Sequence, residues 1–117
     1  MTTVPTPDGG ALISRPELSA AALKAALAIV SPNQLPRMLE DEAKAVTETF
    51  RTDDTTHVRA FLMHWATVVE IERFPDRARS YHQAEYEAHN ATTVDECRKY
   101  ASIVGDIWRT CFAAVSK

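Results

Sequence analysis

The stretch YHQAEYEAHN, residues 81–90, contains the side chains most suited to metal binding or acid–base chemistry. His82, Glu85 and His89 are spaced by three and four positions, so they share one face of a helix. Two imidazoles and a carboxylate in this arrangement suit zinc or iron, but no recognised motif supplies a fourth ligand. We therefore expect no metal and no other cofactor. The alternative is a metal site formed by His82, Glu85 and His89.

Ten residues earlier, Glu72 falls in the middle of an apolar helical stripe. A carboxylate there is costly unless a cation or hydrogen-bond donor pairs with it. Several basic residues follow around Pro75, where the chain must bend. We expect Glu72 to be buried and bonded to an Arg or His between residues 73 and 82. The expected cluster, which either fixes the angle between helices or binds a ligand, comprises Glu72, Arg73, Arg79, His82 and Glu85.

Other catalytic motifs are absent from the sequence. The chain has three glycines, of which two precede residue 11 and the third, Gly105, lies inside a predicted helix, so no glycine-rich phosphate loop is present. There is no nucleophile elbow, no CxxC pair and no HExxH motif. We therefore do not expect an enzyme. Cys97 and Cys111 lie on one predicted helix, too far apart for a disulfide, and we expect both to be buried as small apolar residues.

These side chains must be positioned by helices, because no segment has the pattern of a strand. Residues 1–13 contain Pro5, Pro7 and two glycines and predict a flexible tail. Residues 14–117 predict one all-α domain, a single compact bundle of four to five helices. The first helix is expected from near Pro16 to residue 30. The second is expected after a capping box at Ser31 and Gln34, with an inward stripe of Leu35, Leu39, Ala43, Val46 and Phe50.

The C-terminal half has stronger helical patterns. A third helix is expected from about Asp54 to the FPD sequence at residues 74–76, and a fourth from Pro75 to His89. Thr93 and Glu96 predict a capping box for the fifth helix. The apolar seam of this last helix is spaced as in a short coiled coil and consists of Cys97, Ala101, Val104, Trp108, Cys111 and Val115.

The segment FLMHWATVVEIERFPDRARSYHQAEYEA resembles the central part of a family of small actinobacterial proteins of unknown function. The similarity lies in Trp65, Ile71-Glu72-Arg73, Pro75, Ala78-Arg79, His82 and Ala84-Glu85. It extends over most of the chain after the tail and is best over residues 61–88. The resemblance implies a compact, soluble helical module inside the cell, and it implies no activity.

Charge and hydropathy narrow the function classes. The net charge of −3 argues against general nucleic-acid binding, and no apolar run is long enough to span a membrane. The N-terminus has no secretory signal, so we expect a cytoplasmic protein. The leading hypothesis is a protein-interaction module, regulatory or antitoxin-like, whose partner is another protein or a second copy bound through Val104, Trp108 and Phe112. The alternative is a small-ligand or metal-binding protein that uses Glu72, His82, Glu85 and His89.

Overall fold

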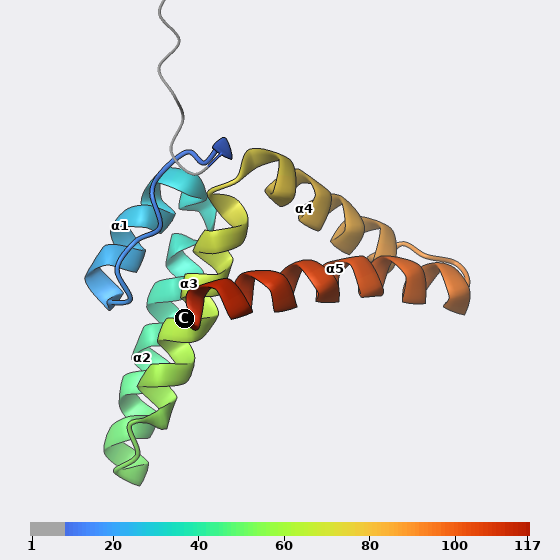
Figure 1. Cartoon of the computed structure of the whole chain (residues 1–117). Helices are drawn as coiled ribbons and strands as arrows, with labels where there is room; N and C mark the ends of the chain where they lie inside the picture. Colours follow the sequence, from blue (N-terminus) through green and yellow to red (C-terminus); the bar gives the residue numbers. More distant parts are fainter. Residues whose placement is uncertain (1–8) are drawn as a thin grey trace, which may run out of the picture.

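The computed structural model describes residues 9–117, and every regular element in this range is a helix. The elements are α1 (Ala20–Val30), the 3₁₀ turn η2 (Pro32–Gln34), α2 (Leu35–Thr52), α3 (Thr56–Glu72), α4 (Pro75–His89) and α5 (Val94–Val115). The predicted all-α fold of four to five helices is confirmed. Helices α1, α2 and α3 pack together, whereas α4 and α5 form an antiparallel hairpin that extends away from them (Figure 1).

Helix α3 is the centre of the core. It contributes Phe61, Trp65, Ala66 and Val69 to a buried cluster in which α1 and α2 supply Leu23, Ala26, Leu27 and Met38. The indole of Trp65 is only 1% exposed. Burying a side chain of this size stabilises the fold by about 3 kcal/mol or less, so the group as a whole is the main source of stability. In the described part of the chain, no helix is long and apolar enough to cross a membrane.

The N-terminal segment is ordered earlier than the sequence predicts. The predicted tail covers residues 1–13, of which residues 1–8 lie outside the described residues. Ala11 is buried, and the Leu12 amide donates to the Arg73 carbonyl at 2.7 Å. Helix α1 then begins at Ala20 and not near Pro16, because the Ser19 hydroxyl accepts a hydrogen bond from the Ala22 amide and caps the helix.

The SPNQ sequence at residues 31–34 forms a different structure from the predicted capping box. Its last three residues form η2, and Ser31 makes no side-chain cap. The Ser31 hydroxyl instead donates to Asn33 Oδ1 at 2.9 Å and accepts from Gln34 Nε2 at 3.0 Å. The Gln34 amide is thereby oriented toward α3, where it contacts Glu72.

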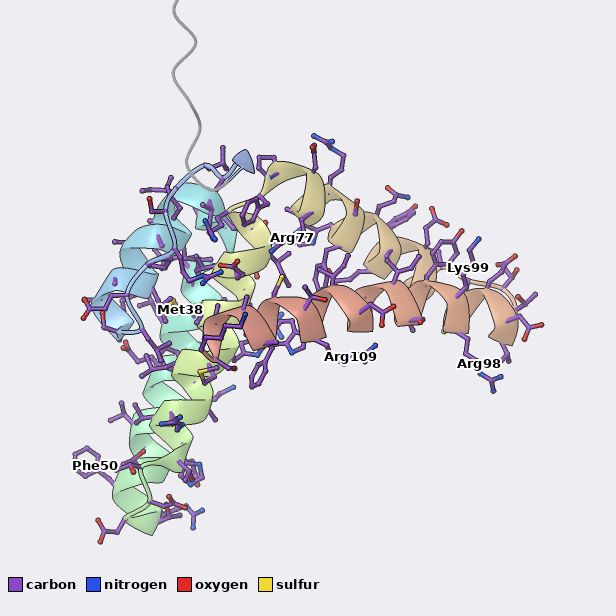
Figure 2. All side chains as sticks on the ribbon, in the orientation of Figure 1. Met38, Phe50, Arg77, Arg98, Lys99 and Arg109 are labelled. Carbon is purple, nitrogen blue, oxygen red and sulfur yellow. The ribbon has the colours of Figure 1, made fainter. Side chains whose placement is uncertain are left out.

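The predicted inward stripe of α2 is wrong except at Leu35, which is partly buried and packs against the core. Leu39 and Val46 are about half exposed and Phe50 is 86% exposed, whereas Met38 is completely buried (Figure 2). The inward face carries polar residues that find partners on other helices. Asp41 accepts a hydrogen bond from the Trp65 indole, and Glu42 pairs with Lys24 of α1.

The two helix boundaries beyond α3 are close to those predicted. Phe74 adopts an extended conformation before Pro75, which opens α4 at its first position. Thr93 caps α5 by accepting from the Glu96 amide at 3.1 Å. The seam of α5 is buried only toward its C-terminal end, at Cys111. Cys97 and Ala101 are exposed, because the first half of α5 packs against α4 alone (Figure 1).

Candidate functional site

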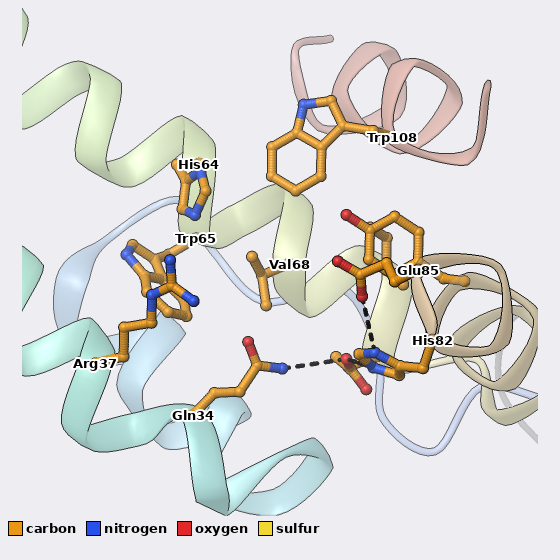
Figure 3. Close-up of a pocket in the computed structure, with 11 residues that line it drawn as sticks. Gln34, Arg37, His64, Trp65, Val68, His82, Glu85 and Trp108 are labelled. Atoms are coloured by element: carbon orange, nitrogen blue, oxygen red, sulfur yellow. Dashed lines mark hydrogen bonds and ion pairs between the residues drawn. The ribbon is translucent and has the colours of Figure 1, made fainter. Parts of the chain in front are cut away.

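A cleft of about 300 Å³ lies where α2, α3, α4 and α5 meet (Figure 3). One wall is formed by Gln34 at the end of η2 and Arg37 in the first turn of α2, and the floor by Trp65 and Val68 of α3. Helices α4 and α5 complete the lining with Tyr81, His82, Glu85 and Trp108. The volume is at the lower end of the range for small-molecule sites in proteins.

A hydrogen-bonded chain of polar side chains crosses one side of the cleft. Gln34 Nε2 donates to Glu72 Oε1 at 3.1 Å, and His82 Nε2 pairs with the same oxygen. The other ring nitrogen, His82 Nδ1, lies 3.2 Å from Glu85 Oε1. Only the imidazolium form of histidine donates from both ring nitrogens, so this form satisfies both carboxylates. His82 is thus fixed between two helices by two acidic groups.

The prediction for Glu72 is confirmed, but the predicted cluster is divided in the structure. Glu72 is 8% exposed and binds His82, and Glu85 joins the same group. Arg73 instead binds Glu70, with Nε and Oε1 2.8 Å apart. Arg79 is exposed and pairs with Asp76 in the preceding turn of α4. Arg73 binds Glu70 and not Glu72 because it follows Glu70 by three residues, so the two side chains lie on the same face of the helix.

A second, more deeply buried network surrounds Glu70 and was not predicted from the sequence. This carboxylate is 3% exposed and receives two hydrogen bonds from Arg15, at 2.9 and 3.0 Å, and two from Arg73. Arg77 Nη1 lies 3.7 Å from it and also donates to the sulfur of Cys111 at 3.0 Å. The network therefore joins the N-terminal segment, α3, α4 and α5. The one sequence feature that could have indicated this network is the spacing of three residues between Glu70 and Arg73, which suits an ion pair on a helix.

The charges of this network oppose a strong burial effect. Burial raises the pKa of the Glu70 carboxyl. The hydrogen bonds from Arg15 and Arg73 and the charges of both guanidinium groups lower this pKa by more than burial raises it. The net pKa lies below its ordinary value. Glu70 is therefore an ionised group that belongs to the structure and not to the cleft.

The other side of the cleft is aromatic. The ring of His64 lies between those of Trp65 and Trp108, with centroid distances of 5.2 and 5.1 Å. Burial lowers the pKa of His64; the Asp41 charge opposes this change, and the Arg37 charge adds to it. Trp108 was predicted from the sequence to be an interface residue, together with Val104 and Phe112. Trp108 lines the cleft, Val104 is half-buried, and Phe112 is 43% exposed.

Two polar groups of the cleft make no hydrogen bond or ion pair with any residue of 9–117. They are the guanidinium of Arg37 and the hydroxyl of Tyr81. Burial raises the pKa of Tyr81, as do the nearby charges of Glu85 and Glu72, so the phenol keeps its proton. The cleft thus offers an available cation and an available hydroxyl beside the His82 group. Arg37 and His64 were not predicted as site residues because neither lies in a motif.

No metal-binding group of three or more His, Cys, Asp or Glu side chains occurs in the part of the chain that the structure describes. The alternative site of His82, Glu85 and His89 is not assembled. His82 and Glu85 contact each other, but His82 also binds Glu72, and His89 is exposed one turn farther along α4.

Comparison with known proteins yields no match: no family model, no curated protein and no solved structure is significantly similar to this chain. The resemblance to the actinobacterial family stays a prediction. The function must therefore be argued from the geometry of the cleft.

Proposed function

We propose that this protein binds a small organic molecule in the cleft between α2, α3, α4 and α5. The observation that carries the proposal is that the Arg37 guanidinium and the Tyr81 hydroxyl line the same concave space as Trp108 and make no hydrogen bond or ion pair with the described residues. Ligand sites in proteins combine apolar walls with a few convergent polar groups, and this cleft has both.

We propose binding without catalysis. The cleft lining contains no serine, threonine, cysteine or lysine that can act as a nucleophile. His82 is held by two carboxylates, so both of its ring nitrogens are already engaged. The acidic group and the aromatic wall then serve to recognise a ligand.

The test is a binding screen by two-dimensional NMR on the full chain. Mixtures of amines, carboxylates, amino acids and nucleobases are added at millimolar concentration, and shifts are expected at backbone amides around Trp65, Val68 and Trp108. The same shifts should weaken in a Trp108→Ala variant and persist in Phe50→Ala, whose side chain is 86% exposed on the far end of α2. A screen in which no compound moves cleft resonances overturns the proposal.

A second candidate function, self-association, is favoured by the outer face of α2. Leu39, Ala43, Val46 and Phe50 are exposed there and follow the four-three-four spacing of a coiled-coil seam. We propose a second copy as the partner, because an antiparallel pair of α2 helices places Leu39 against Phe50 and Ala43 against Val46. Sedimentation equilibrium should show a dimer that Phe50→Glu dissociates. A monomer at all concentrations contradicts it.

A further inference from the structure

The charges of the cleft are separated along its length. Arg37 lies on the α2 side, and His82 and Glu85 lie on the α4 side, with Val68 between them on the floor (Figure 3). One end is therefore basic and the other is dominated by carboxylates. A ligand that occupies the whole cleft meets both ends.

The acidic end keeps a negative charge after its internal contacts are counted. Glu72 and Glu85 are two carboxylates, and the one basic group between them is a single imidazole ring, which carries at most one positive charge. Both contacts of Glu72 are made by Oε1, and the contact of Glu85 is also made by Oε1. The second oxygen of each therefore remains able to accept a hydrogen bond. An ammonium group, with three donors and one positive charge, fits these acceptors.

The basic end of the cleft requires an anionic acceptor. The Arg37 guanidinium forms no ion pair with the described residues, whereas Arg73 and Arg77 are bound to Glu70. A guanidinium presents parallel N–H donors whose geometry matches a carboxylate. The ring of His64 lies next to it, and Trp108 packs on His64 at 5.1 Å. The space between the two ends is thus bounded by apolar and aromatic groups.

We propose that the ligand is a small zwitterion, with its ammonium group bound by Glu72 and Glu85, its carboxylate bound by Arg37, and its carbon skeleton packed against Val68 and Trp108. This inference rests on the proposed ligand-binding function. A simple amine leaves Arg37 without an acceptor, and a simple acid leaves the two carboxylates without a cation. A zwitterion satisfies both ends in one molecule.

The experiment uses probes that differ in the separation of their charges. Glycine, β-alanine, 4-aminobutyrate and 6-aminohexanoate are titrated into the full-length protein, together with butylamine and butyrate as singly charged analogues. We expect one zwitterion to bind at least about tenfold more tightly than either analogue, since each end contributes a charge-assisted contact. The preferred chain length then reports the distance between Arg37 and the acidic pair.

Two variants test which end of the cleft binds the carboxylate of the ligand and which end binds its ammonium group. Arg37→Gln should weaken the best zwitterion by about tenfold and leave butylamine unchanged, whereas Glu85→Gln should weaken both the zwitterion and butylamine. Arg98→Gln is the matched control, because Arg98 is exposed and points away from the fold near the distal end of α5 (Figure 2). An equal effect of Arg37→Gln on zwitterion and amine overturns the assignment of the carboxylate end.

The outcomes separate this inference from the proposed function. If butylamine or butyrate binds as tightly as every zwitterion, the zwitterion class is wrong and the cleft remains a ligand site. The same holds if no probe binds but the broader metabolite screen yields another cleft ligand. If neither the probes nor the screen moves a cleft resonance, both proposals fail.

Discussion

Glu70 and Glu72 leave the last turn of α3 two residues apart, and their carboxylates bind partners on different sides of the helix. Glu70 is held by Arg15 and Arg73, whereas Glu72 is held by Gln34 and His82. Two positions on a helix differ by about 200°, so neighbouring acidic residues serve separate junctions. One joins the N-terminal segment to the α3–α4 bend, and the other joins η2 to α4.

Replacing Glu70 with Gln should destabilise the protein strongly. The change keeps the shape of the side chain but removes the negative charge that pairs with the Arg73 guanidinium, whose side chain is only 3% exposed. We expect a loss of about 3 kcal/mol in the free energy of unfolding, measured by urea denaturation. The control is Glu48→Gln, which breaks the exposed pair with Arg51 and should leave the urea midpoint nearly unchanged. Equal midpoints for the two variants would contradict a structural role of Glu70.

The stability should also depend on pH through Glu70. Its pKa in the folded state lies below the ordinary value of 4.5, so the unfolded state binds a proton first as the pH falls. The stabilisation is present above pH 4.5 and is lost as the pH falls through the lower folded pKa. Urea unfolding of the wild type from pH 6 to pH 3 should therefore show a steeper acid loss than Glu70→Gln. Parallel curves would show that Glu70 is not the titrating group.

The orientation of α2 can be tested with two adjacent residues. Met38 is fully buried in the core and Leu39 is 47% exposed. Met38→Ala should lower the free energy of unfolding by about 2–5 kcal/mol, because it removes buried methylene groups and leaves a cavity. Leu39→Ala should have a much smaller effect. The reverse order of stabilities would mean that α2 is rotated so that Leu39 faces the core.

The two cysteines should differ in reactivity. Cys111 is completely buried beneath Arg77, and its burial raises the pKa of the thiol, while Cys97 is exposed near the start of α5. A disulfide reagent that reports thiol release should therefore modify one thiol in the native protein and both in denaturant. The Cys97→Ser variant should show no rapid reaction. Rapid labelling of this variant would mean that Cys111 is not buried where α5 packs against the other helices.

The helix boundaries that the sequence predicted depend on local signals. Pro75 and Thr93 act through their own backbone or the next turn, and they fixed the starts of α4 and α5 correctly. The face of α2 was mispredicted because it depends on residues far away in the chain. Asp41 and Glu42 bind Trp65 and Lys24 on other helices, and no pattern within α2 indicates these partners.

Only part of the candidate site could be predicted from the sequence. Glu72 and His82 were found because a carboxylate interrupts an apolar stripe just before a bend lined with basic residues. Arg37 and His64 were missed because exposed positions on two helices become neighbours only through packing. Arg15 was missed because the sequence gives no sign that the segment before α1 returns to the end of α3.

The antiparallel α4–α5 hairpin also determines the order in which the chain can close its contacts. The hairpin joins segments linked by a few residues, so its loop-closure entropy is small. The contact between Arg77 and Cys111 spans 34 positions and that between Arg15 and Glu70 spans 55. During synthesis, the acidic half of the cleft is complete once α4 has emerged. The wall formed by Trp108 follows only with α5, so the cleft acquires its full shape after the core of α1, α2 and α3 can close.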